Sequence, residues 1–340
     1  MSSNDFIYRT PNLESYWRGL ILFGRNTASY KFAFAKSLLE LKPESGQLLK
    51  LEDIAPVFSR NLIEHLKVAP KQIISPSSSY LSSLVKNGIE TVNQQKVIED
   101  TLKLGFVNVV DAFQNIGTSE IPHKFYLNEV PINKGIRITD NFSKLMESIQ
   151  FANLDAEVDS RWSLVERAWE LGVTSSVISI HHNYDTNSFF SFDKQERPSN
   201  ITSARGALNG YQKGKCFYCF CNINVNVGSE THVDHFFPFK LAKQFGQILN
   251  GVWNLVLACS ICNGGSQKRD RIPSKNLLSR LNKRNEDLIS SHHPLRETLI
   301  LQTGQSEQLR KDFLATFYYN SEPLLGLPWE PDPTEPDIFE

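Results

Sequence analysis

The sequence predicts an α+β protein with a mainly helical first part and a smaller part that contains short strands. Through most of the first 195 residues, apolar side chains recur at the spacing of amphipathic helices. The polar stretch at 193–200, which contains Pro198, predicts a linker. Beyond it, cysteines form two Cys-x-x-Cys pairs separated by short apolar segments. We therefore expect one domain at 1–195, a second at 196–290 and a carboxy-terminal extension at 291–340.

The helices of the first part are predicted from apolar spacing and from the residues that interrupt it. Residues 13–41 hold two helices, because Gly24 breaks the pattern and Thr27 is a suitable N-cap for the second. The same reasoning predicts further helices at 51–68, 80–116 and 160–171, and short strands at 124–130, 135–140 and 175–180.

Length and composition set broad limits on the class of protein. A chain of 340 residues with 40% hydrophobic content can bury the core of more than one domain. It contains no apolar run near the roughly 20 residues that cross a bilayer, and Met1–Asp5 does not begin a secretion signal. We therefore expect a cytoplasmic protein without a membrane partner.

The cysteines have the spacing of a metal site. Two Cys-x-x-Cys pairs can hold one tetrahedral Zn²⁺, and a site closed by four thiolates has no position for substrate. A structural zinc is therefore predicted, and a disulfide framework is disfavoured in a reducing compartment. Cys221 is a fifth thiol, which we interpret as a free, partly buried cysteine. The predicted zinc ligands are Cys216, Cys219, Cys259 and Cys262.

The segment between the two cysteine pairs carries polar groups suited to catalysis. A strand is predicted at 232–235, between helices at 204–211 and 241–249. Side chains two apart share one face of a strand, so His232 and Asp234 point one way and His235 the other, unless the strand twists or bulges.

The charge distribution singles out the same part of the chain. Residues 201–290 contain 12 Lys plus Arg against 5 Asp plus Glu, a local charge of +7, although the net charge of the whole chain is -1. A basic segment of this kind is typical of proteins that bind a polyanion, since Lys and Arg replace the counterions of phosphates. The alternative is a merely solvated basic face.

These motifs, taken in order, resemble the zinc-stapled HNH endonucleases, whose catalytic core is the ββα-metal fold. The resemblance covers about 201–284 and runs through the first cysteine pair, Asp-His-x-x-Pro, Asn-Leu-Val-Leu-Ala-Cys, and Cys-Asn. It implies a metal-dependent hydrolase of DNA phosphodiester bonds that nicks one strand or cleaves both. An unrelated zinc ribbon is the alternative reading of the cysteines.

The resemblance also implies roles for individual residues. His235 is expected to be the general base that activates water, while Asp234 and Asn263 bind the catalytic ion. Hard oxygen ligands favour Mg²⁺, which Mn²⁺ or Ni²⁺ could replace. Asn263 departs from the histidine that the family name implies. Asn254 resembles the central Asn that braces the loop and orients the histidine.

The resemblance implies less definite roles for the other residues. His232 either touches the metal or phosphate, or lies behind the metal ligands or in solvent. Basic residues after Asn263 are expected to contact phosphates on either side of the cut. These residues are Lys268, Arg269, Arg271 and Lys275.

A helical domain attached to a small nuclease suggests a regulated effector. Such chains are similar to effectors of bacterial antiphage systems, including the nuclease component of Zorya-type defence, and to restriction enzymes. DNA and other subunits of a defence system are therefore the expected partners. The rival interpretation is a non-catalytic, zinc-stabilised module that binds DNA or protein.

Two further features stand outside this core. Residues 322–340 contain six acidic residues, five prolines and no Lys or Arg, which predicts an extended, poorly ordered tail. The tail is either solubilising or lies across the basic segment as an inhibitor. The histidine pairs at 181–182 and 292–293 lack ligand neighbours at metal spacing, so we interpret both as loop residues.

Overall fold

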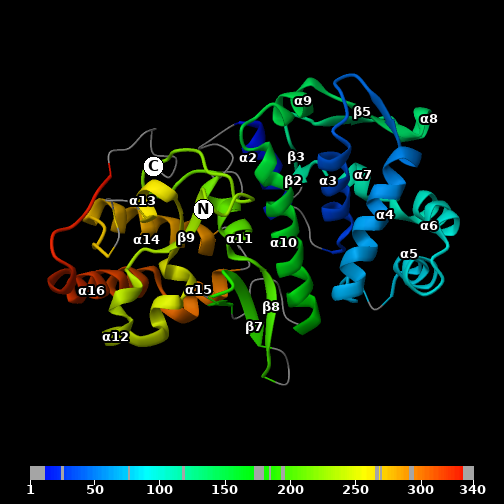
Figure 1. Ribbon diagram of the computed structural model, residues 1–340. Helices are drawn as coiled ribbons and strands as arrows, with labels where there is room; N and C mark the ends of the chain where they lie inside the picture. The colour runs from blue at the N-terminus through cyan, green and yellow to red at the C-terminus, as the bar shows by residue number, and fades with distance from the viewer. Residues whose placement is uncertain are drawn as a thin grey trace. The chain divides into compact units, whose positions relative to one another are not determined.

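The structure of the chain is a computed structural model, in which helices and small sheets alternate (Figure 1). It forms two compact units, an amino-terminal unit at Pro11–Gly172 and a carboxy-terminal unit at Val173–Glu340. The expected boundary at residue 195 therefore lies too late. The described residues are 12–23, 27–75, 77–116, 119–171, 180–183, 185–192, 196–264, 268, 270–290 and 295–331.

The amino-terminal unit is mainly helical, as predicted. Its longer helices are α2 (Leu13–Phe23), α3 (Tyr30–Leu41), α4 (Leu51–Val68) and α10 (Phe151–Leu171). Its shorter helical elements are α5 (Ser79–Ser83), η1 (Leu84–Glu90), α6 (Gln94–Asp100), η2 (Thr101–Gly105), α7 (Val109–Ala112), α8 (Val130–Asn133) and α9 (Asp140–Met146). Its strands are β1 (Leu48–Lys50), β2 (Asn115–Ile116), β3 (Ser119–Glu120), β4 (Tyr126–Asn128) and β5 (Gly135–Ile138).

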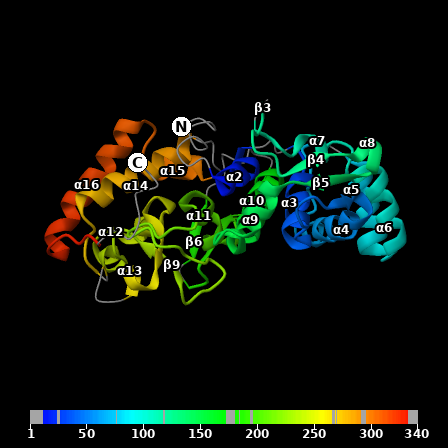
Figure 2. The same ribbon diagram turned by 90° about the horizontal axis from the view of Figure 1, so that it is seen from above.

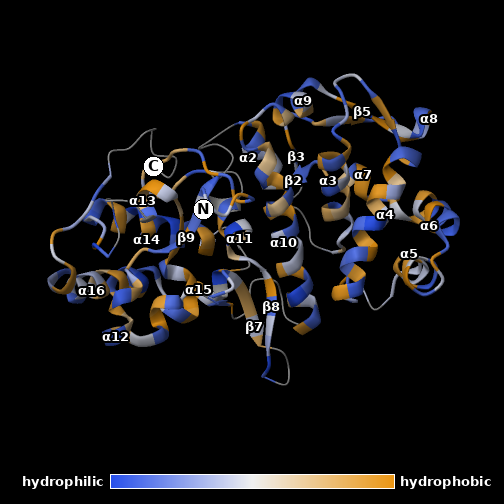
Figure 3. Ribbon diagram, viewed as in Figure 1, coloured by the Kyte–Doolittle hydropathy of each residue, from blue (hydrophilic) through white to orange (hydrophobic). Residues whose placement is uncertain are grey.

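Apolar spacing explains how the long helices pack. Along α4, buried residues such as Ile54, Phe58 and Leu62 recur every four residues and form one face. Figure 3 shows apolar and polar patches alternating along this helix. On α3, the Phe32 ring stacks on Trp162 of α10 with ring centroids 5.9 Å apart. Aromatic burial of this kind supplies much of the stability of the unit.

The strands of the amino-terminal unit form small antiparallel sheets. The larger has the order β1-β5-β4, with Leu49 opposite Ile136. Gly135 lies at the point of closest approach, since a β-carbon there would be 2.5 Å from the Leu49 carbonyl oxygen. Only glycine fits that register without displacing the backbone.

The carboxy-terminal unit combines small sheets with helices. Its strands are β6 (His181–Asn183), β7 (Ser188–Phe192), β8 (Pro198–Ser203), β9 (Thr231–His235) and β10 (Leu255–Cys259). Its helices are α11 (Ala204–Gln212), α12 (Ala242–Phe245), α13 (Ser260–Gly264), α14 (Lys275–Ser290), α15 (Arg296–Thr303) and α16 (Glu307–Leu325). Short 3-10 turns lie at η3 (Phe239–Leu241), η4 (Gly246–Asn250) and η5 (Val252–Asn254).

A three-stranded sheet replaces the predicted linker. The strands have the order β6-β7-β8, and Phe192 of β7 lies opposite Pro198, the first residue of β8. Proline is tolerated at the first position of a strand, which explains why it was mistaken for a linker signal. The strand predicted at 175–180 lies outside the described residues except for Ile180. The first histidine pair, which was predicted in a loop, lies in β6.

The helices α14, α15 and α16 pack against one another, and α14 and α16 lie side by side in both views (Figures 1 and 2). The chain beyond them turns back onto the unit. Trp329 donates its backbone N–H to the Ile272 carbonyl at 2.8 Å and accepts from the Ser274 N–H at 2.8 Å. Trp329 as a whole is 3% exposed.

The expectation of a poorly ordered tail from Glu322 is therefore wrong as far as Pro331. The helix α16 continues to Leu325 with Pro323 in its last turn, and Trp329 packs beyond it. Composition gave the wrong prediction here, because burial of one tryptophan stabilises this segment more than its acidic residues and prolines destabilise it. Residues 332–340 lie outside the description. Among the described helices, none is both long and apolar enough to cross a bilayer.

Candidate metal centre and adjacent histidine

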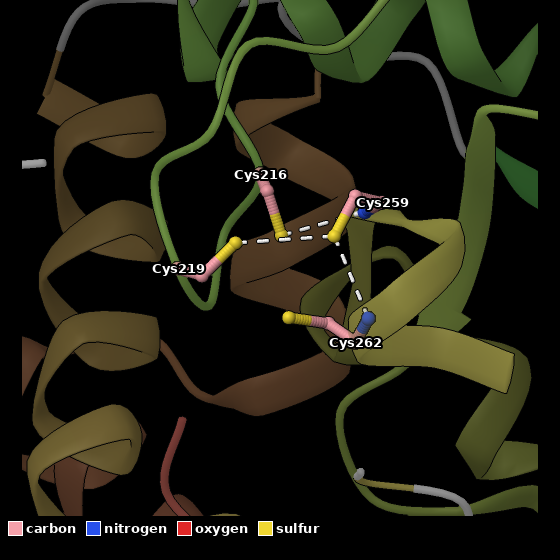
Figure 4. Close-up of side chains that lie close together, drawn as sticks. All are labelled: Cys216, Cys219, Cys259 and Cys262. Atoms are coloured by element: carbon pink, nitrogen blue, oxygen red, sulfur yellow. Dashed lines mark hydrogen bonds between the residues drawn. The ribbon is translucent and has the colours of Figure 1, made fainter. Parts of the chain in front are cut away.

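The four predicted zinc ligands converge on one point (Figure 4). Their sulfur atoms all lie within 4.8 Å of one another, and all four residues are buried. Tetrahedral Zn–S bonds of about 2.3 Å separate sulfurs by about 3.8 Å. The Sγ atoms of Cys219 and Cys259 are 3.8 Å apart. The cluster therefore has the dimensions and the soft donor set of a structural zinc site.

The backbone around the cluster prepares it for a cation. The Cys259 N–H points at Cys216 Sγ at 3.4 Å, and the Cys262 N–H points at Cys259 Sγ at 3.5 Å. Phe220 adopts a φ of 63°, which turns the first knuckle back toward β10. Amide donors of this kind stabilise thiolates. Each Cys-x-x-Cys pair thus supplies half of the ligand cage, and the fold brings the two halves together.

The closeness of the four thiols shifts their pKa values in opposite directions. Hydrogen bonds from Cys216, and then from Cys259 and Cys262, lower the pKa of Cys219. Hydrogen bonding to Cys219 raises the pKa of Cys216 to about 12. One thiolate is thus favoured at the expense of its neighbours, whereas a divalent cation would stabilise all four.

The hairpin β9–β10 connects this cluster to the predicted catalytic residues. The strands are antiparallel, with Thr231 opposite Cys259 at one end and His235 opposite Leu255 at the other. The two ends are about 13 Å apart at the usual rise of a strand. A zinc in the cysteine cluster is therefore too far from His235 to take part in chemistry there. The short helix α13 follows β10 and packs against both strands.

Asp234 lies on the cluster side of the hairpin. It is 9% exposed, and its Oδ2 accepts a hydrogen bond from the Tyr218 hydroxyl at 2.6 Å. The same oxygen lies 2.7 Å from Lys268 Nζ. Both contacts use Oδ2, so within the described chain Oδ1 is the oxygen that can bind a divalent cation.

Lys268 is placed differently from the sequence prediction, which assigned it to surface phosphate contacts. Its side chain is 1% exposed. The ammonium donates to the His235 carbonyl oxygen at 2.6 Å and pairs with Asp234. A buried cation requires such partners, because desolvation without them is costly. Its ammonium therefore has partners inside the unit, and the predicted phosphate contact would have to compete with them.

His235 lies on the opposite face of the hairpin and is 4% exposed. Its Nε2 lies 3.0 Å from Asn250 Oδ1, while Asn250 Nδ2 donates to Gln247 Oε1 at 2.8 Å. The second bond fixes the orientation of the Asn250 amide. His235 Nε2 therefore carries the proton, and Nδ1 carries the lone pair that can accept one.

Burial keeps the His235 ring neutral. It lowers the pKa of His235 to about 4, against the hydrogen bond to Asn250 and the charge of Asp234, which raise it. The His182 ring, whose centroid lies 6.2 Å from that of His235, lowers the pKa of His235 further. At neutral pH the imidazole is therefore available as a base rather than as a cation.

Asn254 holds the loop between the two strands. It is fully buried, and its Oδ1 accepts from the Phe237 N–H at 2.7 Å. Its Nδ2 donates to the carbonyls of Phe237 at 3.1 Å and Leu249 at 2.9 Å. The amide thus ties both ends of the loop to the start of β10. These contacts fit the bracing role expected of Asn254. The contact that orients His235 comes instead from Asn250.

The other described residues of the predicted site range from half-buried to exposed. Asn263 lies on α13, half-buried, and His232 lies half-buried opposite Ala258. Arg271 and Lys275 are exposed, and Arg269 lies outside the described residues.

Three contributors were missed by sequence reasoning. Asn250 and Tyr218 hold His235 and Asp234, respectively. The Gln212 side chain accepts a hydrogen bond from the Leu257 N–H at 2.7 Å and donates one to the Leu257 carbonyl at 2.9 Å. Its amide therefore pairs with β10 as the backbone of a neighbouring strand would. No local spacing signals these roles, although Tyr218 lies within the first cysteine pair.

Comparisons with protein-family models, curated proteins and solved structures found no match for this chain.

Proposed function

We propose that the carboxy-terminal unit is a metal-dependent endonuclease that hydrolyses DNA phosphodiester bonds by HNH-type chemistry. The observation that carries this proposal is the state of His235. A buried, neutral imidazole with its proton fixed on Nε2 by Asn250 presents Nδ1 as a base. It stands at one end of a hairpin whose other end joins the cysteine cluster, and Asp234, the preceding residue, lies on the opposite face of that hairpin.

In this proposal, His235 Nδ1 removes a proton from the attacking water. Asp234 Oδ1 and the Asn263 amide oxygen would hold Mg²⁺, with Mn²⁺ or Ni²⁺ as substitutes. The ion would supply charge stabilisation for the phosphate and the departing oxygen. Asn254 keeps the loop fixed, so that the base does not have to reorganise during the reaction.

In the same proposal, Lys268 holds catalytic residues in place from inside the unit. Its ammonium holds the Asp234 carboxylate and the His235 carbonyl together, which fixes two neighbouring catalytic positions. Phosphate binding then depends on the exposed cations Arg271 and Lys275, whose contacts carry no sequence information. DNA is the proposed substrate because the local charge of 201–290 is +7.

The test is cleavage of supercoiled plasmid by the full-length protein with Mg²⁺ or Mn²⁺. Replacing His235 with Ala should reduce the rate roughly 10²–10⁴-fold, as expected for loss of a general base. Bound zinc should remain unchanged, because the cysteine cluster is distant. His123→Ala, an exposed histidine of the amino-terminal unit, serves as the matched control. A wild-type protein that leaves plasmid intact would count against the proposal.

One observation favours the rival interpretation, a non-catalytic zinc-stabilised module that binds DNA or protein. Asp234 is already neutralised by Lys268, which weakens its attraction for a second cation. This rival predicts that His235→Ala leaves DNA or partner binding intact and that only cysteine substitutions abolish function. Plasmid cleavage by the wild type decides between the two.

A regulated role in antiphage defence or restriction, with other subunits as partners, is the proposed context, because an unrestrained nuclease would damage its own cell. Inhibition by the acidic tail remains a prediction. The informative truncation ends after Pro331, since a cut after Leu325 would also remove the buried Trp329. No rise in cleavage after this truncation would exclude tail inhibition.

A further inference from the structure

Residues 327–330, just beyond α16, form a strap that lies along the chain at the start of α14. Trp329 pairs in parallel with Pro273, and its backbone makes two hydrogen bonds of 2.8 Å to the neighbouring residues. Glu330 accepts a hydrogen bond from Asn276 Nδ2 at 3.2 Å. Backbone pairing and a side-chain contact therefore hold the strap on the carboxy-terminal unit.

Trp329 is the residue of the strap that enters the core. It is buried, whereas Leu327 of the same strap is 86% exposed. The Trp329 ring contacts the ring of Tyr218, with centroids 5.2 Å apart and planes inclined at 72°. Edge-to-face packing of this kind favours one relative orientation of the two rings. Trp329 therefore connects the strap to the first cysteine pair, within which Tyr218 lies.

Tyr218 extends this connection to the proposed metal ligand. Its ring is buried, and Lys268 Nζ lies 5.7 Å from the ring centroid. Its hydroxyl donates to Asp234 Oδ2 at 2.6 Å, and Lys268 Nζ lies 2.7 Å from the same oxygen. Two donors on one oxygen oppose rotation of the carboxylate, so the direction of Oδ1 is fixed.

The position of the Tyr218 hydroxyl depends on what packs against its ring. Without the Trp329 side chain, a cavity would remain beside the ring, and the ring would have room to move. The hydroxyl would then hold Asp234 less firmly. Groups that orient a metal ligand in this way typically contribute about 10–100-fold to metal affinity.

The same tryptophan faces one of the proposed phosphate contacts. The Arg271 guanidinium lies 6.0 Å from the centroid of the Trp329 ring. A guanidinium is attracted to the face of an indole. One ring thus contacts both the tyrosine that holds Asp234 and a cation proposed to bind the substrate.

We propose that Trp329 is a positioning residue of the metal site: through the Tyr218 hydroxyl, it holds the Asp234 carboxylate in the orientation that binds the divalent cation. This role rests on the proposed function and adds to it a dependence of the metal site on the carboxy-terminal strap. The sign of the effect is defined, since an undocked strap weakens binding of the cation.

Binding of Mn²⁺, followed by electron paramagnetic resonance, tests this role in the full-length protein with its zinc in place. We expect Trp329→Ala and Tyr218→Phe each to weaken Mn²⁺ binding about tenfold, as typical for loss of a group that orients a ligand. The double variant should bind no more weakly than Tyr218→Phe alone, because the hydroxyl through which Trp329 acts is already missing. Trp329→Phe, which keeps a ring edge beside Tyr218, should recover most of the affinity.

Leu327→Ala is the matched control, because it shortens an exposed apolar side chain of the same strap. It should bind Mn²⁺ as the wild type does. Zinc content, measured by elemental analysis, should be the same in every variant, which separates loss of positioning from unfolding of the cysteine cluster. If Trp329→Ala loses zinc, Trp329→Leu takes its place in the same comparison, since leucine retains more of the buried apolar volume.

Three results would contradict the positioning role. Unchanged Mn²⁺ affinity in Trp329→Ala would show that the strap does not influence the site. A double variant that binds about tenfold more weakly than Tyr218→Phe would show that Trp329 acts by a route other than the hydroxyl. An equal loss in Leu327→Ala would assign the effect to the strap as a whole and not to the Trp329 ring.

Plasmid cleavage separates the positioning role from the proposed function. A wild type that binds Mn²⁺ and cuts plasmid, with Trp329→Ala unaffected, loses the positioning role and keeps the nuclease. A wild type that shows the expected coupling but cuts nothing keeps the positioning role and loses the nuclease. A wild type that neither binds Mn²⁺ nor cuts plasmid loses both.

Discussion

The two ends of the β9–β10 hairpin show two ways in which a sequence builds a functional site. At one end, Cys259 joins three other buried cysteines, and the ligand set consists of identical groups at short spacing. At the other end, His235 and Asp234 are neighbours in sequence but face opposite sides of the hairpin. Each is held by a partner that no spacing rule predicts.

The difference shows which part of the site depends on its surroundings. The cysteine end needs only a turn and a cation, because Cys-x-x-Cys geometry is local. The histidine end needs Asn250 to fix the imidazole and Lys268 to neutralise Asp234. Variants at the two ends of the hairpin should therefore lose different properties of the protein.

The largest effect is expected at the cysteine end. Cys259→Ser should remove bound zinc and leave the hairpin unfolded, because structural zinc contributes roughly 10–16 kcal/mol of apparent binding free energy. Zinc per chain, measured by elemental analysis, should fall from one to near zero. Limited proteolysis should then cut near β9 and β10.

Cys221→Ser is the matched control for this experiment. Cys221 is half-buried and lies outside the four-sulfur cluster. Its replacement should leave both zinc content and protease resistance unchanged. If both serine variants behave alike, the contrast between the two ends of the hairpin is wrong.

A smaller effect is expected at the histidine end. Lys268→Met keeps much of the side-chain volume but leaves Asp234 buried without its cation, which should cost about 3–5 kcal/mol in the free energy of unfolding. Urea unfolding followed by zinc release measures the change. Millimolar Mg²⁺ should recover part of the loss, because it can bind the carboxylate that Lys268 no longer occupies.

Lys275→Met provides the comparison, since Lys275 is exposed and should change stability by less than about 0.5 kcal/mol. A Lys268→Met protein as stable as the wild type without Mg²⁺ would show that the buried pair has no influence. A destabilised protein that does not respond to Mg²⁺ would argue against Asp234 as a metal ligand.

The smallest effect concerns an imidazole of the amino-terminal unit, whose environment is the reverse of that of His235. His65 stacks on Trp162 at 3.5 Å and contacts Glu166 at 2.7 Å and Asp159 at 3.2 Å. Burial lowers its pKa, but the hydrogen bonds to Asp159 and Glu166, and their charges, raise it to about 9.

The stabilisation from His65 should therefore be complete below pH 6.5 and be lost as pH rises through about 9. It amounts to at most about 3 kcal/mol. Thermal unfolding of the wild type and of His65→Gln between pH 6 and pH 10 measures it, and the variant should lack this dependence. Chelators should leave the amino-terminal unit unaffected. An unchanged pH profile in the variant would contradict this account.

Local patterns predicted several elements well. The helix at 51–68 has the bounds of α4, and the helix at 204–211 differs from α11 by one residue. Both have regular apolar spacing and clear end signals, so nearest neighbours along the chain decide their structure. The cysteine cluster was predicted for the same reason, since its ligand spacing is local within each pair.

Other elements depended on contacts that the sequence does not display. The helix predicted at 80–116 is broken into α5, η1, α6, η2, α7 and the strand β2, because tertiary packing overrides propensity. The helix predicted at 241–249 is divided into the short helix α12 and the 3-10 turns η3 and η4, and the hydrogen bond from Asn254 to the Leu249 carbonyl fixes its end. Pro198 starts a strand because β7 is available to pair with it.

The sequence by itself determined the two Cys-x-x-Cys pairs, the alternation along β9 and the main helices, because each depends on residues close together in the chain. Tertiary structure decided the rest of the site. It brought Lys268 inside to meet Asp234, set Asn250 against His235, and packed Trp329 against Tyr218. Those residues are distant in sequence, and burial makes each polar group depend on its partner, so only the assembled fold determines which groups meet.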